Sequence, residues 1–197
     1  LSGERLMILT NGGGAGVLAT DELLDAGGAF ALLSPELQET LNKVLPSTWS
    51  HANPIDIIGD AGPERYRASL SAILQDRNTD AVLVIQCPTA LASSIDNARA
   101  VVATANPEPD GGPALKPVLT CWLGDETART SRDLFESNGL PAFETPSDAI
   151  TGFMQLVRHT RAQTELMRTP GGHGRAALAQ PERQSSPFDP GGRMRPS

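Results

Sequence analysis

The sequence predicts an α/β domain built on a doubly wound parallel sheet. Two observations support this class. Short apolar runs of strand length alternate along the chain with segments whose apolar residues recur at helical spacing. One run, residues 81–85, is apolar at every position, as expected of a central strand that helices cover on both faces. Alternation of this kind is typical of a parallel sheet between two helical layers.

The first half of the chain supplies three strands, each followed by a helix. The strands are expected at the apolar runs 5–10, 29–33 and 54–58. The helices are expected over residues 17–26 and 35–44 and from residue 63 onward. Ser34 is a favourable N-cap for the second helix, and Pro35 suits its first position because that position needs no hydrogen-bonded N–H.

The second half continues the same alternation. Strands are expected at residues 81–85, 118–122 and 140–143, and helices after Ser93 or Ser94, over 125–138 and from residue 146. Gly139 follows the second of these helices, where glycine commonly ends a helix. Five or six parallel strands joined by short loops give a flavodoxin-like domain, which we expect to span residues 1–169.

Composition changes at about Pro170. Residues 170–197 contain five glycines and five prolines but few large apolar side chains. Such a segment cannot bury enough surface to offset its ordering entropy, so we expect a disordered C-terminal tail or linker. Because the sequence begins with Leu1 rather than Met, we expect a fragment or a processed chain.

Charge and cysteine content restrict the partners. The net charge is −7, which argues against nucleic acid or an anionic membrane as a partner. No apolar run is long enough for a membrane span. Cys87 and Cys121 form no CxxC motif or metal-ligand pattern, so we expect no metal site and a cytoplasmic protein.

A glycine-rich segment follows the first expected strand. It reads Thr10-Asn11-Gly12-Gly13-Gly14-Ala15-Gly16 and leads into the first helix. Backbone N–H groups and the helix dipole favour an anion at such a position, and glycine lets a phosphate reach the backbone. The segment is neither a P-loop nor a G-x-G-x-x-G fingerprint, so the glycines alone fit a tight turn equally well.

Two further loops are expected beside this segment. Ligands of doubly wound sheets bind at the carboxyl ends of the strands, near the point where strand order reverses. Under the 2-1-3 order usual for the class, the loop at 59–62 follows an adjacent strand and the loop at 86–89 comes next. We therefore expect a cleft lined by Asp56, Gly59, Asp60 and Thr89. Asp56 would point into it and Asp60 would cap the next helix, although both also fit turns held by their own side chains.

Three segments together resemble a known family. They are Thr10–Asp21, Asn53-Pro54-Ile55-Asp56-Ile57-Ile58-Gly59-Asp60-Ala61 and Asp80-Ala81-Val82-Leu83-Val84-Ile85. They are similar to NDP-forming acyl-CoA synthetases, namely ADP-forming acetate–CoA ligases and related protein acetyltransferases. More distantly, the chain resembles the flavodoxin-like domain of a succinyl-CoA ligase subunit. The resemblance covers about Gly3 to Met167.

The resemblance implies a role in phosphoryl transfer. In this family, a histidine of a preceding domain carries phosphate between the acyl-CoA site and the nucleotide site. It is held between two helix N-termini, one of which this domain contributes. The implied phosphate contacts are Asn11, Gly12, Gly13, Gly14, Ala15 and Gly16. The whole enzyme would use CoA, ATP or ADP, and Mg²⁺, whereas this chain alone is expected to bind no cofactor and to supply no catalytic residue.

The sequence also departs from the family pattern. The Ser-His-Thr-Gly-like motif of the phosphorylated histidine is missing, since Ala52 follows His51 and His159 lies in the last expected helix. The expected partners are therefore the His-bearing CoA-binding domain and the ATP-grasp domain of the same enzyme, and the isolated chain should be inactive. The resemblance fits two kinds of full-length protein: a ligase, or an acetyltransferase whose ligase-like half is regulatory.

Two other functional classes share features with this sequence. A receiver-like phosphoacceptor would use Asp56, Thr89 and Lys116, but it needs an acidic pair after the first strand, where Asn11 and glycines stand. A flavin- or phosphate-binding flavodoxin-like module stays open, although the glycine-rich segment offers few hydroxyl groups and the chain has only two tryptophans.

Overall fold

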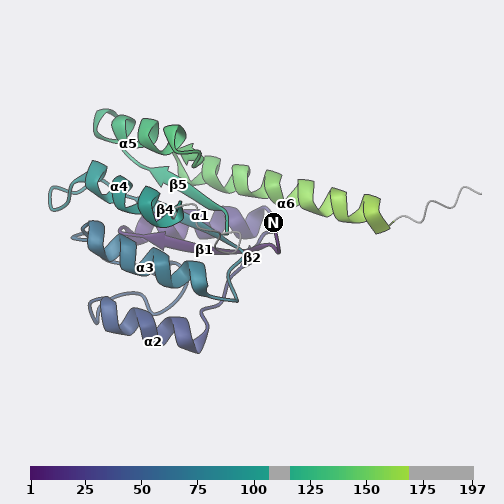
Figure 1. Ribbon diagram of the computed structural model, residues 1–197, viewed down its shortest axis with the longest axis horizontal. Coiled ribbons are helices and arrows are strands. Elements are labelled where there is room, and N and C mark those ends of the chain that lie inside the picture. The colour runs from purple at the N-terminus through teal and green to yellow at the C-terminus, as the bar shows by residue number, and fades with distance from the viewer. Residues whose placement is uncertain (107–115, 169–197) are drawn as a thin grey trace, which may run out of the picture.

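The computed structural model describes residues 1–106 and 116–168, in which six strands and six helices alternate (Figure 1). In chain order they are β1 (Arg5–Thr10), α1 (Gly13–Asp25), β2 (Ala29–Phe30), α2 (Pro35–Val44), β3 (Ile55–Asp56), α3 (Pro63–Gln75), β4 (Ala81–Gln86), α4 (Ser94–Ala105), β5 (Val118–Trp122), α5 (Glu126–Ser137), β6 (Ala142–Phe143) and α6 (Pro146–Arg168). The predicted α/β class is confirmed. The expected tail lies outside the described residues.

All the strand pairs are parallel, and the sheet has the order β2-β1-β4-β5-β6, with β3 also paired to β1. β2 pairs with the start of β1, at Arg5, and β3 pairs with its end, at Thr10. β4 occupies the opposite edge of β1. The expected 2-1-3 order is therefore wrong for the third strand. β3 has only two residues, which is too short to pair along the whole of β1. It pairs with the end of β1 on the edge that β2 also uses, opposite β4.

Helices cover both faces of the sheet (Figure 1). α2, α3, α4 and α5 contribute to one buried cluster, which includes Tyr66, Trp122 and Phe135, whereas α1 and α6 contribute to the other. Alternate residues of β1 divide between the two clusters, as the period of a strand requires. The expected inward face of the last helix is confirmed, since Phe153 and Met154 are buried there.

Asn53 joins the strands on the β2–β3 side. Its Oδ1 accepts a hydrogen bond from the Ile8 amide at 2.9 Å. Its Nδ2 donates to the carbonyl oxygens of Leu6 and Ala31, both at 2.9 Å. The side chain thus satisfies Ile8, which lies between the stretches of β1 that β2 and β3 pair with, and links Leu6 of β1 to Ala31 just after β2.

α1 begins earlier than expected. The sequence predicted that the helix starts just after the glycine-rich segment, at Val17. Instead Gly12 is the N-cap, and its carbonyl oxygen accepts hydrogen bonds from the amides of Ala15 and Gly16 at 3.1 and 3.2 Å. The second part of the glycine-rich segment, Gly12 to Gly16, is therefore the N-cap and first turn of the helix, and we call it the glycine turn. Across the described part of the chain, no helix has the length and apolar character needed to cross a membrane.

Candidate functional site

The start of α1 offers two backbone N–H groups that no other group of the described residues accepts. The Gly12 amide donates to Thr10 Oγ1 at 3.0 Å, and the next amides to be bonded are those of Ala15 and Gly16. The amides of Gly13 and Gly14 lie between them. α1 has no side-chain cap and no acidic residue in its first turn. Its partial positive charge is therefore not offset from within the helix.

Contacts within the domain explain all but one of the glycines in this turn. A Cβ at Gly12 would collide with Cys87 Sγ, and one at Gly13 would lie 2.9 Å from Asp56 Oδ2. A Cβ at Gly16 would lie 3.0 Å from Pro54 Cβ. At Gly14 a Cβ would meet nothing within 4 Å. Gly14 is exposed, so a group from outside the chain can approach this residue.

Asn11 connects the ends of two strands. Its Nδ2 donates to the Cys87 carbonyl oxygen at 3.0 Å, and its Oδ1 accepts from the Cys87 amide at 2.7 Å. Asn11 is only 3% exposed. Its side chain is thus engaged in fixing the glycine turn against the loop after β4. No local pattern indicates Cys87 as the partner, because the two residues are 76 positions apart.

The side chain of Asp56 lies beside Gly13 of the same turn. Its Oδ1 accepts from the Ile58 amide at 2.9 Å, which is the turn bond that the sequence left open, and its Oδ2 faces Gly13. Ile58 has a φ of 70°, a costly conformation for a β-branched residue. The negative charge of Asp56 beside Gly13 repels a second anion at this position, which weakens the binding of any anion to the amides of Gly13 and Gly14.

Asp60 does not cap α3, which corrects the expectation from the sequence. The N-cap is Gly62, and it makes no side-chain bond. Asp60 instead pairs with Arg65, with Oδ1 and Nη1 2.5 Å apart. The hydrogen bond from Arg65 lowers the pKa of Asp60. Asp60 is exposed and points its charge at α3 rather than at the glycine turn.

The loops after β1, β3 and β4 meet at the carboxyl edge of the sheet. A Cβ at Gly59 would lie 3.7 Å from the Asn11 carbonyl oxygen and 3.8 Å from Thr89 Cγ2. Because β4 is the direct neighbour of β1, the loop with Thr89 lies closer to the glycine turn than the expected strand order implied. The convergence of the loops is as the sequence predicted.

Lys116 lies at the other end of the sheet. It precedes β5, and its Nζ donates to the carbonyl oxygens of Ile73 and Asp76 near the end of α3. Asp56 instead ends β3 and pairs with Thr10 at the carboxyl end of β1. The receiver-like interpretation, which needs Lys116 beside Asp56, is therefore wrong. Within the two described stretches, no group of three His, Cys, Asp or Glu side chains is placed to hold a metal ion.

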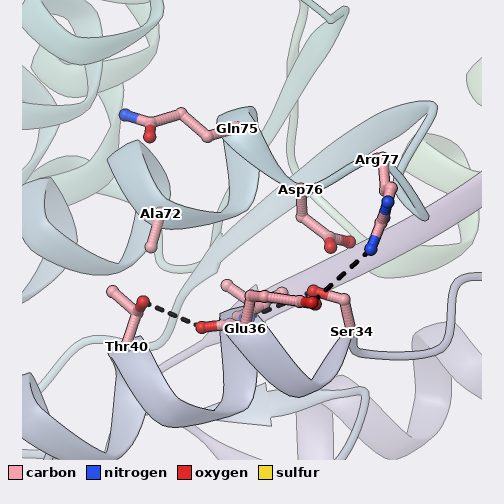
Figure 2. A pocket seen from close by; sticks show the side chains of 8 residues that line it. Ser34, Glu36, Thr40, Ala72, Gln75, Asp76 and Arg77 are labelled. Carbon is pink, nitrogen blue, oxygen red and sulfur yellow. Dashed lines mark hydrogen bonds and ion pairs between the residues drawn. The ribbon is translucent and has the colours of Figure 1, made fainter.

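A separate cavity of about 330 Å³ opens between α2 and α3 (Figure 2). Arg77 Nη2 and Glu36 Oε1 face each other across it at 3.5 Å, and the carboxylate of Asp76 lies beside them. This cavity lies near the start of α2 and the end of α3, and no residue expected to bind phosphate lines it. The carboxyl edge remains the better candidate site.

Comparison with known proteins identifies the family. The Ligase-CoA domain model matches residues 6–165. The ADP-forming acetate–CoA ligase I of Archaeoglobus fulgidus is 34% identical over 157 residues, which are 80% of this chain and 21% of that protein. The alpha subunit of ADP-forming acetate–CoA ligase II of Pyrococcus furiosus is 30% identical over 161 residues, 81% of this chain and 34% of that subunit.

Solved structures agree with this assignment. The apo form of the dinucleotide-forming acetyl-coenzyme A synthetase 1 of Candidatus Korarchaeum cryptofilum superposes with a TM-score of 0.75 at 31% identity, covering 85% of this chain and 36% of that one. The same enzyme in complex with phosphate and ADP gives the same TM-score of 0.75. This chain thus spans about a fifth to a third of the length of its curated relatives. It belongs to the Ligase-CoA domain family and is homologous to part of the ADP-forming acetate–CoA ligases.

Proposed function

We propose that this chain is the module of an ADP-forming acyl-CoA ligase that holds the phosphoryl group of a phosphohistidine at the start of α1. The histidine belongs to a partner domain. The observation that carries the proposal is the pair of unbonded amides at Gly13 and Gly14, with open space beside Gly14.

The chemistry of such a site needs no nucleophile from this chain. Phosphoryl transfer depends on positioning and on stabilising the charge of the phosphoryl oxygens. The amides of Gly13 and Gly14 donate to those oxygens, and the N-terminal end of α1 adds its partial positive charge. Asn11 holds the turn against Cys87, so that the donors keep their place. CoA, the nucleotide and Mg²⁺ are bound by the partner domains.

Asp56 makes the site weak for free phosphate. Its Oδ2 lies where a Cβ of Gly13 would be 2.9 Å away, and its charge repels a dianion. We therefore expect millimolar affinity for inorganic phosphate and much tighter holding of a phosphoryl group that the partner domain positions. Asp56→Asn should strengthen the binding of free phosphate.

The test is an NMR titration of the ¹⁵N-labelled chain with inorganic phosphate. Shifts should concentrate at the amides of Gly13 and Gly14 and should be lost in Gly14→Val. Gly62→Val is the matched control, since Gly62 is also a glycine at a helix start with nothing within 4 Å of its Cβ position. Shifts elsewhere that leave the glycine turn unchanged would refute the proposal.

The isolated chain should neither hydrolyse ATP nor form acyl-CoA. Supplied in trans with the missing domains, it should restore acyl-CoA formation, and Gly14→Val should reduce the turnover while Gly62→Val does not. Acyl-CoA formation by the chain alone would require an active site of its own and would overturn the assignment as a module.

A further inference from the structure

The side-chain oxygen of Gln86 is buried without a hydrogen-bond partner among the described residues. Gln86 ends β4, and its main chain is held in the sheet, since its carbonyl oxygen accepts from the Leu123 amide at 2.9 Å. The residue is 1% exposed, and its Oε1 meets no donor among the described residues. A buried amide left in this state costs free energy that a partner would recover.

A second polar atom near Gln86, the hydroxyl oxygen of Thr89, also lacks a hydrogen-bond partner. This Oγ1 atom is buried and unbonded within the described part of the chain. Gln86 and Thr89 both line a cavity of about 610 Å³ between the starts of α4 and α5. Thr127, Thr130, Ile95 and Arg99 complete much of its wall. The cavity adjoins the candidate site, because Thr89 Cγ2 and the Asn11 carbonyl oxygen both lie within 4 Å of the Cβ position of Gly59.

The unbonded groups define the chemistry of the occupant. A primary amide carries a donor and an acceptor side by side, and it is complemented by the N–H and C=O of one residue of an extended chain, which point to the same side. The Asn11 side chain pairs with the N–H and C=O of Cys87 in this way. A fully deprotonated anion cannot donate to Gln86 Oε1. The one cation of the wall, Arg99, already donates to Asp96 Oδ1 at 2.8 Å. The walls combine apolar carbon with hydroxyl groups, which suits the neutral backbone of a peptide.

We propose that this cavity binds an extended backbone segment of the partner domain, with the N–H and C=O of one residue paired to the Gln86 amide and the Thr89 hydroxyl bonded beside it. Most of the length of the homologous enzymes lies outside this chain, so such a segment is available. The identity of the partner rests on the proposed function, whereas the amide chemistry does not. Docking there would bring the partner's chain alongside the start of α1.

The test uses N-acetyl-alanine-N-methylamide, which has two peptide units and no charge, as the probe for the ¹⁵N-labelled chain. We expect saturable shifts of the Gln86 side-chain NH₂ signals and of the Thr89 amide. Gln86→Leu should weaken binding at least fivefold and should also raise the melting temperature, because an apolar side chain removes an unpaired buried amide. Gln38→Leu, on the exposed side of α2, is the matched control.

Several outcomes would overturn the proposal. They are the absence of saturable shifts at Gln86, equal weakening by Gln38→Leu, and a Gln86→Leu variant that binds normally. A lower melting temperature in Gln86→Leu would indicate a structural role for Gln86. In that case Thr89→Val is the deciding variant: loss of probe binding supports the proposal, and unchanged probe binding overturns it. Phosphate titration reads the amides of Gly13 and Gly14 separately, so failure of this proposal is distinguishable from failure of the proposed function.

Discussion

Asn11 and Cys87 are joined by two reciprocal hydrogen bonds, of 3.0 and 2.7 Å, between the side-chain amide of one and the backbone of the other. These bonds tie the end of β1 to the loop after β4. The free amides at the start of α1 therefore keep a fixed position relative to Thr89. The geometry of the candidate site depends on this one buried side chain.

Asn11→Ala should destabilise the domain by about 2–4 kcal/mol, because it removes both bonds and leaves the N–H and C=O of Cys87 unpaired. Urea unfolding measures the loss. Asn42→Ala is the control, since Asn42 makes a single side-chain bond, with Trp49 Nε1 at 3.0 Å, and should cost about 1 kcal/mol. Equal losses in the two variants would contradict the structural role of Asn11.

Local patterns predicted most of the fold, and long-range pairings set the rest. The Ser34 cap is confirmed by its bond with the Leu37 amide at 3.1 Å, and Gly139 has the expected positive φ, 73°. These features depend on neighbours in the sequence. The early start of α1 does not, because contacts of Gly12 and Gly16 with Cys87 and Pro54 favour glycine in its first turn. No local pattern indicates such contacts.

Asn53 offers a second test of a side chain that completes the sheet. Asn53→Ala should cost about 2–4 kcal/mol, since it leaves the Ile8 N–H and the Ala31 carbonyl group without a partner. The Leu6 carbonyl oxygen loses one of two bonds and still accepts from the Ala31 amide at 3.0 Å. Asn53→Asp keeps only the acceptor for Ile8 and places a negative charge against the carbonyl oxygens of Leu6 and Ala31. It should therefore be no better than alanine in urea unfolding. Recovery of stability in Asn53→Asp would show that the two carbonyl bonds contribute little.

Gly14 and Gly16 should respond oppositely to alanine. Gly14→Ala should stabilise the chain by about 0.5–1 kcal/mol, because alanine favours the helix and its Cβ meets nothing within 4 Å. Gly16→Ala should destabilise it, since its Cβ would lie 3.0 Å from Pro54 Cβ and Thr10 Cγ2. Thermal unfolding measures both changes. If Gly14→Ala is stabilising and still weakens phosphate binding, glycine at this position serves the ligand rather than the fold.

The Arg5–Asp80 pair predicts a pH dependence of stability. Arg5 donates to Asp80 Oδ2 through its amide and its Nε, at 2.9 and 2.8 Å, and these bonds with Arg5 lower the pKa of Asp80. Because the folded pKa is below the unfolded one, the contribution is present above about pH 4 and is lost as the pH falls through the folded pKa.

Asp80→Asn should accordingly cost about 1–2 kcal/mol at pH 7, toward the low end for charged hydrogen bonds because the Arg5 side chain is 42% exposed. The difference from the unmodified chain should shrink steadily below pH 4 in urea unfolding. Glu39→Gln, which removes an exposed ion pair with Lys43, should leave the free energy of unfolding unchanged both at pH 7 and below pH 4. A cost of Asp80→Asn that does not vary with pH would contradict the ionic role.

The two thiols should differ in reactivity, and Asp56 should control the faster one. Burial raises the pKa of Cys87, and the charge of Asp56 raises it further. Burial raises the pKa of Cys121 to about 12, so Cys121 should react with Ellman's reagent only when the chain unfolds. At pH 8, Asp56→Asn should lower the pKa of Cys87 and speed its reaction, whereas Asp60→Asn, whose carboxylate pairs with Arg65, should not. Cys87→Ser and Cys121→Ser show which thiol gives each kinetic phase of the reaction. Equal reaction rates of Cys87 in Asp56→Asn and in the unmodified chain would show that the charge of Asp56 does not act on Cys87.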